Sequence, residues 1–129
     1  MNESISYNNA VRRLFFSPAH AGDLQDRHEM SLTAEVSESA NGARIVLAAG
    51  IDAELISAMA YRVRGCPHLV AALELLCEKL ENRPVAALEK PVTADITREL
   101  CIPVEKSGLI LLLEDAVAIL WTQFATVND

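Results

Sequence analysis

The first third of the chain combines one short helical stripe with a strictly alternating segment. Residues 5–16 repeat apolar side chains at helical spacing, and Pro18 ends that predicted helix. Residues 17–28 show no period and predict a surface loop. Apolar and polar residues then alternate from Met30 to Ser37, which predicts a half-buried strand.

Two further strands are predicted to follow as a meander. Asn41-Gly42 favours a hairpin turn because both residues tolerate positive φ, and the mostly apolar run 44–51 predicts the second strand. A turn over 52–54 leads into a third strand, 55–64. Its core face is predicted to carry the alternate residues Leu55, Ser57, Met59, Tyr61 and Val63.

The period becomes helical after Gly65. Residues 67–81 predict a helix, and Pro67 suits its first turn because no N–H is needed there. A short helical piece from Pro84 to Leu88, a helix capped by Thr93 and extending through Leu100, and a last helix over 108–125 complete the prediction. This order predicts a single α+β domain over residues 1–129, with helices packed on a three-stranded antiparallel sheet.

Composition and charge narrow the class of protein. The chain has 129 residues, 51% hydrophobic and 22% charged, as packed domains do. Its net charge of −7 disfavours nucleic acid as a partner. The apolar stretch 109–121 is too short for a membrane span and contains Glu114 and Asp115, so a core helix and no membrane contact are expected.

The cysteine count and the start of the chain indicate a reducing compartment. Three cysteines cannot form a complete disulfide framework, so free thiols are expected. The opening residues Met1 to Ser4 lack the basic and apolar regions of a signal peptide. We therefore expect a cytoplasmic protein.

Cys66 is the first candidate for chemistry. It lies where a predicted strand ends and a helix begins, in Gly65-Cys66-Pro67-His68, and a helix N-terminus stabilises a thiolate. Such a thiolate can bind metal or attack a persulfide. The competing interpretation is a small, half-buried residue at a tight turn. Zinc held by Cys66 with His68 or Cys101 is a third, weaker hypothesis.

The remaining polar candidates have simpler interpretations. Cys77 falls among leucines and is expected in the core, and Cys101 ends a predicted helix. His20 and His28 are expected to be solvated in their loop, and Glu35, Glu38, Glu114 and Asp115 to lie at the surface. The chain contains no glycine-rich phosphate loop, no Gly-x-Ser-x-Gly and no His-Glu-x-x-His, so we expect no enzyme activity.

Several anchors in order resemble one known family. They are Tyr7, Phe16-Ser17-Pro18 and Gly22 near the start, Gly65-Cys66 before the long helix, and Asp95-Ile96, Glu99-Leu100, Pro103, Lys106 and Glu114-Asp115-Ala116 afterwards. In these the chain resembles the iron–sulfur cluster assembly scaffolds of the IscU type, equivalent to the N-terminal domain of NifU. The resemblance implies an antiparallel three-stranded sheet covered by helices. It also implies assembly of a [2Fe–2S] cluster from iron and desulfurase-derived sulfur.

The resemblance also assigns the cluster ligands, and here the chain departs from the family. The positions of three cysteines, an aspartate and a histidine fall on Asn41, Ala43, Cys66, Gly108 and Leu109. Of these only Cys66 supplies a soft anionic donor, which is what iron binds in such clusters. Cys66 is therefore the single candidate metal ligand. We do not expect a complete set of ligands for a standard cluster or for zinc.

Two hypotheses follow for the function. The first is a divergent scaffold-family protein that accepts sulfur on Cys66 or docks a partner, such as a cysteine desulfurase or another iron–sulfur assembly protein. The second is a protein-interaction or assembly module unrelated to clusters, in which the surface near Asn41, Gly108 and Leu109 contacts a partner or a second copy of the chain.

Overall fold

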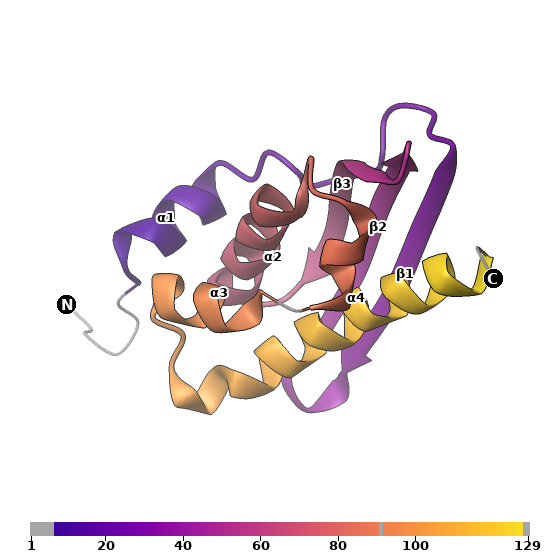
Figure 1. Ribbon diagram of the computed structural model, residues 1–129. Helices are drawn as coiled ribbons and strands as arrows, with labels where there is room; N and C mark the ends of the chain where they lie inside the picture. Colours follow the sequence, from indigo (N-terminus) through magenta and orange to yellow (C-terminus); the bar gives the residue numbers. More distant parts are fainter. Residues whose placement is uncertain (1–6, 91, 128–129) are drawn as a thin grey trace.

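A three-stranded antiparallel sheet forms the centre of the fold, in a computed structural model that describes residues 7–90 and 92–127. The strands are β1 (Met30–Glu38), β2 (Ala43–Asp52) and β3 (Leu55–Arg64), in that spatial order (Figure 1). The helices are α1 (Asn9–Phe16), α2 (Pro67–Leu80), α3 (Thr93–Leu100) and α4 (Ser107–Val127), with short 3₁₀ segments η2 (Ser39–Asn41), η3 (Val85–Glu89) and η4 (Val104–Lys106). The predicted α+β class and antiparallel meander are confirmed.

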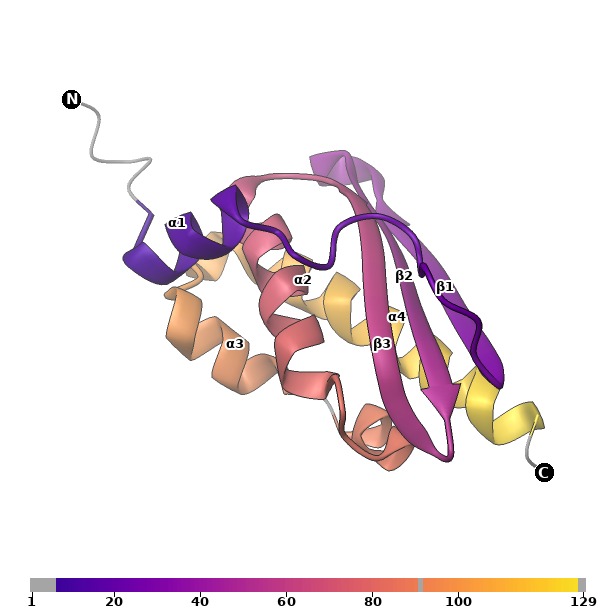
Figure 2. The same cartoon turned by 90° about the horizontal axis from the view of Figure 1, so that it is seen from above.

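The helices α2 and α4 cover one face of the sheet. Helix α4 lies against β1 and β2, α2 lies beside β3, and α1 and α3 pack on α2 (Figures 1 and 2). The core between these layers is aliphatic, and Ile45, Leu47, Leu73, Leu76 and Leu113 are all fully buried in it. Burial of this apolar surface is the main favourable contribution to folding.

Helix α4 has one buried face and one exposed face. The segment Val104–Val127 is long and apolar enough to cross a membrane by length and composition, with a mean hydropathy of 1.6 over an 18-residue window within it. Six of its side chains nevertheless pack into the core, namely Leu109, Leu112, Leu113, Ala116, Val117 and Leu120. The predicted core helix is therefore present, but Leu111 and Ile119 face outward.

The two hairpins turn in different ways. Glu38 pairs with Ala43 across η2, and Gly42 alone takes a left-handed φ of 64°. The expected Asn41-Gly42 hairpin is thus present, but as a 3₁₀ turn closed by glycine. The second turn is a two-residue one, because Asp52 pairs with Leu55, and both Ala53 and Glu54 have positive φ.

A bulge corrects the predicted core face of β3. Gly50 pairs with Ala58 and Ile51 pairs with Ile56, so Ser57 has no directly opposite partner on β2. One extra residue on a strand reverses which side chains face the core before it. Ile56 is therefore buried instead of Leu55, and Ser57 is exposed.

Two predicted helix starts are also corrected. Helix α1 begins at Asn9, because the side chain of Asn8 accepts the N–H of Val11 over 2.8 Å and caps it. Residues 5 and 6 of the predicted helix lie outside the described residues. Thr93 is the first residue of α3 and not its cap, and its buried hydroxyl donates a hydrogen bond to Glu114.

Candidate functional site

Cys66 occupies the junction between β3 and α2. It is the N-cap residue of α2, its side chain makes no capping hydrogen bond, and Pro67 fills the first helical position. Position 65 favours glycine, because a Cβ there would lie 2.6 Å from Cδ2 of Leu69. The Gly-Cys-Pro sequence thus brings the half-buried thiol against the start of the helix.

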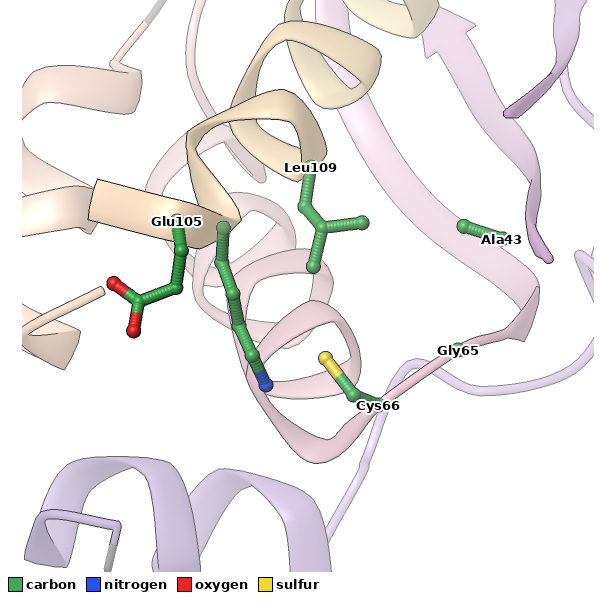
Figure 3. Close-up of a pocket in the computed structure, with 6 residues that line it drawn as sticks. Ala43, Gly65, Cys66, Glu105 and Leu109 are labelled. Carbon is green, nitrogen blue, oxygen red and sulfur yellow. The ribbon is translucent and has the colours of Figure 1, made fainter. Parts of the chain in front are cut away.

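A pocket of about 230 Å³ opens at this thiol. Its walls come from the start of β2, the end of β3, η4 and the first turn of α4, and its lining residues are Ala43, Gly65, Cys66, Glu105, Lys106 and Leu109. In Figure 3 the sulfur of Cys66 points toward the Leu109 side chain, and the carboxylate of Glu105 points away from Cys66. One thiol therefore faces a small pocket with mixed polar and apolar walls.

The pocket gathers the positions that the family resemblance assigned to cluster ligands. Ala43, Cys66 and Leu109 all line it. Gly108 precedes Leu109 in α4, and a Cβ there would lie 3.0 Å from Oε2 of Glu38. The side chain of Asn41 lies outside the described part of the structure. Three positions from three distant segments thus meet in space, although only Cys66 carries a donor for iron.

The other two cysteines do not line the pocket. Cys77 is fully buried in α2, and burial, together with the nearby Glu74 carboxylate, raises the pKa of its thiol well above the usual value. Cys101 is exposed at the end of α3 with a left-handed φ of 52°. The predictions for both residues are confirmed, and neither shares the pocket of Cys66.

His68 and Lys106 form a pair beside the thiol. Nζ of Lys106 lies 3.2 Å from Nδ1 of His68 and 5.9 Å from the centre of the Tyr7 ring. His68 is buried, and this burial, followed by the charge of Lys106, lowers the pKa of its imidazole. Neutral His68 therefore holds the ammonium group of Lys106, which lines the pocket of Cys66.

The donor set does not fit a [2Fe–2S] cluster. Such a cluster takes four ligands, usually cysteine thiolates. This pocket offers one thiol and the carboxylate of Glu105, with a methyl and an isobutyl side chain at Ala43 and Leu109. In the described ranges 7–90 and 92–127, no group of three His, Cys, Asp or Glu side chains could hold a metal ion. Nδ1 of His68, the histidine of the zinc hypothesis, faces Nζ of Lys106.

Both loop histidines were predicted wrongly as solvated. His20 contacts Glu74 and Glu81, and the His28 side chain is only 5% exposed, with Nδ1 2.7 Å from Oδ2 of Asp52. The remaining atom, Nε2 of His28, is buried without a hydrogen-bond partner in the described structure. These contacts join segments far apart in the sequence, which is why local reasoning missed them.

Two other carboxylates that were predicted to lie at the surface also contact partners in the structure. Glu35 pairs with Arg44 across β1 and β2, and Glu114 accepts the hydroxyl of Thr93. Glu74 was missed altogether, although it lies four residues after Val70 and three before Cys77, on an apolar helix face. A charged residue on an apolar helix face could have indicated a buried ion pair.

Comparison with known proteins gives the family. A model of the NifU-like N terminal domain matches residues 6–128, nearly the whole chain. The chain belongs to the NifU-like N-terminal domain family. The expected resemblance to this family is confirmed.

Solved structures share the fold of this NifU-like domain. The N-terminal NifU-like protein from Brucella abortus superposes with a TM-score of 0.69 at 15% identity, covering 92% of this chain and 94% of that one. A candidate iron–sulfur cluster assembly scaffold protein for the SUF system from Fervidobacterium islandicum gives 0.72 at 13% identity, covering 93% and 99%. No curated protein sequence matches the chain.

Proposed function

We propose that this NifU-like domain serves iron–sulfur cluster assembly by accepting sulfur on Cys66, without holding a standard [2Fe–2S] cluster. The observation that carries the proposal is the pocket in which Cys66 supplies the only thiol among the described lining residues, and Ala43 and Leu109 occupy expected ligand positions. In this proposal the donor is the persulfide of a cysteine desulfurase docked on the domain. The domain itself is not an enzyme, and it works in the cytoplasm.

The transfer step needs no further oxidant or reductant. The thiolate of Cys66 attacks the outer sulfur of the donor persulfide, a new S–S bond forms on Cys66, and the donor's S–S bond breaks. The donor cysteine leaves as a thiolate, so one thiolate and one persulfide are present before and after.

The surroundings of Cys66 favour a negative charge on the transferred sulfur. The N-terminus of α2 carries partial positive charge, and the ammonium group of Lys106 lines the same pocket. The carboxylate of Glu105 points away from the thiol (Figure 3). A volume of about 230 Å³ leaves room for an added sulfur atom.

Sulfur transfer is tested with a cysteine desulfurase, cysteine and the purified chain, followed by mass analysis of the intact protein and its peptides. We expect one added sulfur on the peptide that contains Cys66, and none in Cys66→Ser. Cys101→Ser is the matched control, because it removes an exposed thiol outside the pocket. Absence of sulfur on Cys66, or equal labelling of Cys101, would refute the proposal.

A second candidate function, a docking module independent of sulfur, is favoured by one further feature. An apolar groove of about 330 Å³ lies between the end of α3, η4 and the start of α4. It is lined by Thr97, Ile102, Pro103, Val104, Ser107, Ile110 and Leu111. Val104 is 85% exposed and Leu111 is 61% exposed. Exposed apolar surface of this kind is typical of protein contacts.

Sedimentation of the wild type and of Val104→Ser with Leu111→Ser distinguishes the two functions. An association that these substitutions abolish, in a chain that takes up no sulfur on Cys66, would favour the docking module. A monomer that still takes up sulfur would favour the first proposal.

A further inference from the structure

Residues 17–28, here called the strap, connect α1 to β1 by way of the outer edge of β3. The main-chain N–H of Tyr61 donates to the carbonyl of His20 over 3.1 Å, and the N–H of Gly22 donates to the carbonyl of Tyr61 over 2.8 Å. The strap runs on the side of the sheet away from α4 (Figure 2). It therefore occupies hydrogen-bonding positions of an edge strand that would otherwise be open to other chains.

His20 connects the strap to two carboxylates, those of Glu74 in α2 and of Glu81 at its C-cap. Its Nδ1 contacts Oε2 of Glu74, and its Nε2 lies 3.1 Å from Oε1 of Glu81. Its main-chain N–H also donates to Oε1 of Glu74 over 3.0 Å. Because each ring nitrogen faces a carboxylate oxygen, both contacts are hydrogen bonds only when the ring carries two protons.

The carboxylate of Glu74 requires a positively charged partner. It is fully buried, and it also accepts the hydroxyl of Tyr61 over 2.9 Å. A buried carboxylate needs a paired cation, since an unpaired one is costly. The carboxylate of Glu81 is also held in place, because its Oε2 accepts the main-chain N–H of Met59 on β3 over 2.9 Å.

We infer that the strap is held by His20 in its doubly protonated form and is released from the edge of β3 when His20 loses a proton. Loss of the proton would remove the hydrogen bond to Glu74 or to Glu81 and would leave the buried carboxylate of Glu74 without a cation. The main-chain groups of Tyr61 would then face solvent. The strap is thus a pH-sensitive clasp, and this inference stands independently of sulfur transfer.

The direction of the pH effect follows from the shift at His20. Burial lowers the pKa of the imidazole, but hydrogen bonds and charge interactions with Glu74 and Glu81 outweigh it and raise the pKa above 6.5. A raised pKa in the folded state means that the clasp is fully stabilising below pH 6.5. The stabilisation is lost as the pH rises through the raised value.

The other titratable groups around His20 leave this direction unchanged. On β3, burial raises the pKa of Tyr61, and on α2 burial raises the pKa of Cys77, so both stay neutral. On the strap, the hydrogen bond from Arg62 lowers the pKa of Asp23. Asp26 is a further strap residue that lines the cavity beside His20 and Glu81.

The experiment is amide hydrogen–deuterium exchange on the full chain, followed by NMR and corrected for the intrinsic effect of pH. Protection of the Gly22 and Tyr61 amides should fall about tenfold per pH unit between 6.5 and the raised pKa. The imidazole signals of His20 in the same samples give that midpoint. The amide of Leu47 in central β2 is the internal control and should stay protected.

Two variants separate the clasp from a general effect of pH. His20→Gln should give low protection at Gly22 that no longer changes with pH, whereas His28→Gln, the matched histidine of the same strap, should keep the pH dependence. The wild-type titration decides the question even if His20→Gln does not fold. Constant protection of Gly22 and Tyr61 over this range, or a His20 midpoint at or below 6.5, would overturn the inference.

Discussion

Lys106 donates a hydrogen bond from Nζ to Nδ1 of His68 over 3.2 Å. An ammonium group can only donate, so Nδ1 of His68 must be the acceptor and the imidazole is neutral. This pair fixes the only cation that lines the described part of the pocket of Cys66. His68, two residues after Cys66 in the sequence, therefore positions the ammonium group of Lys106.

Removing this lysine should change the titration of His68. In Lys106→Met the charge that helps to lower the pKa of His68 is gone, so the pKa should rise toward 6.5, while burial keeps part of the shift. NMR titration of the imidazole signals measures it. Glu105→Gln, a charge change at the adjacent position, is the control and should move the midpoint less. An unchanged midpoint in Lys106→Met would contradict the pairing.

Glu74 should be the most costly carboxylate of α2 to replace. In Glu74→Gln the buried partner of His20 loses its charge, and breaking a buried pair in this way costs about 3 kcal/mol of unfolding free energy. The matched control is Glu78→Gln on the same helix. Glu78 and its partner Arg13 are exposed, with their charged atoms 3.7 Å apart, so its loss should cost less than about 1 kcal/mol.

Urea unfolding of both variants measures the difference. A clearly larger loss of unfolding free energy is expected for Glu74→Gln than for Glu78→Gln. Equal losses would mean that the contacts of Glu74 with His20 and Tyr61 contribute little to the stability of the fold.

Gly50 should tolerate no side chain while His28 is present. A Cβ at Gly50 would overlap the imidazole of His28, which lies against the sheet and contacts Asp52 and Ser57. Gly50→Ala should therefore destabilise the fold by about 1–3 kcal/mol.

A double-mutant cycle with His28→Ala tests the cause. Once the ring is removed, Gly50→Ala should cost much less, as measured by thermal unfolding. If the cost is the same in both backgrounds, the overlap with His28 is not responsible.

The order of the elements and the place of Cys66 could be predicted because both depend on local sequence. Alternation over Met30–Ser37 reflects one face of a sheet, and Gly65-Cys66-Pro67 marks a strand-to-helix junction whatever surrounds it. The meeting of Ala43 with Cys66 and Leu109 depends on the tertiary fold. Only the family resemblance could supply it in advance.

The remaining errors come from long-range contacts. The core face of β3 depends on the bulge opposite Gly50 and Ile51, which alternation within the strand cannot reveal. His20 is half-buried against Glu74, a residue 54 positions away in the sequence that local reasoning does not reach. Thr93 was predicted to be a cap from its residue type and position alone. Its hydrogen-bond partner Glu114 lies on another helix, which local sequence does not reveal.

Anaerobic reconstitution of the wild-type chain with iron and sulfide tests the central claim, that one thiol cannot hold a cluster here. Asn41→Cys with Ala43→Asp and Leu109→Cys, made together, is the positive control, because it supplies three thiols and a carboxylate with Cys66. We predict a visible iron–sulfur absorption band in the triple variant and none in the wild type. A wild-type protein that binds iron and sulfide stoichiometrically, and loses both in Cys66→Ser, would contradict the account.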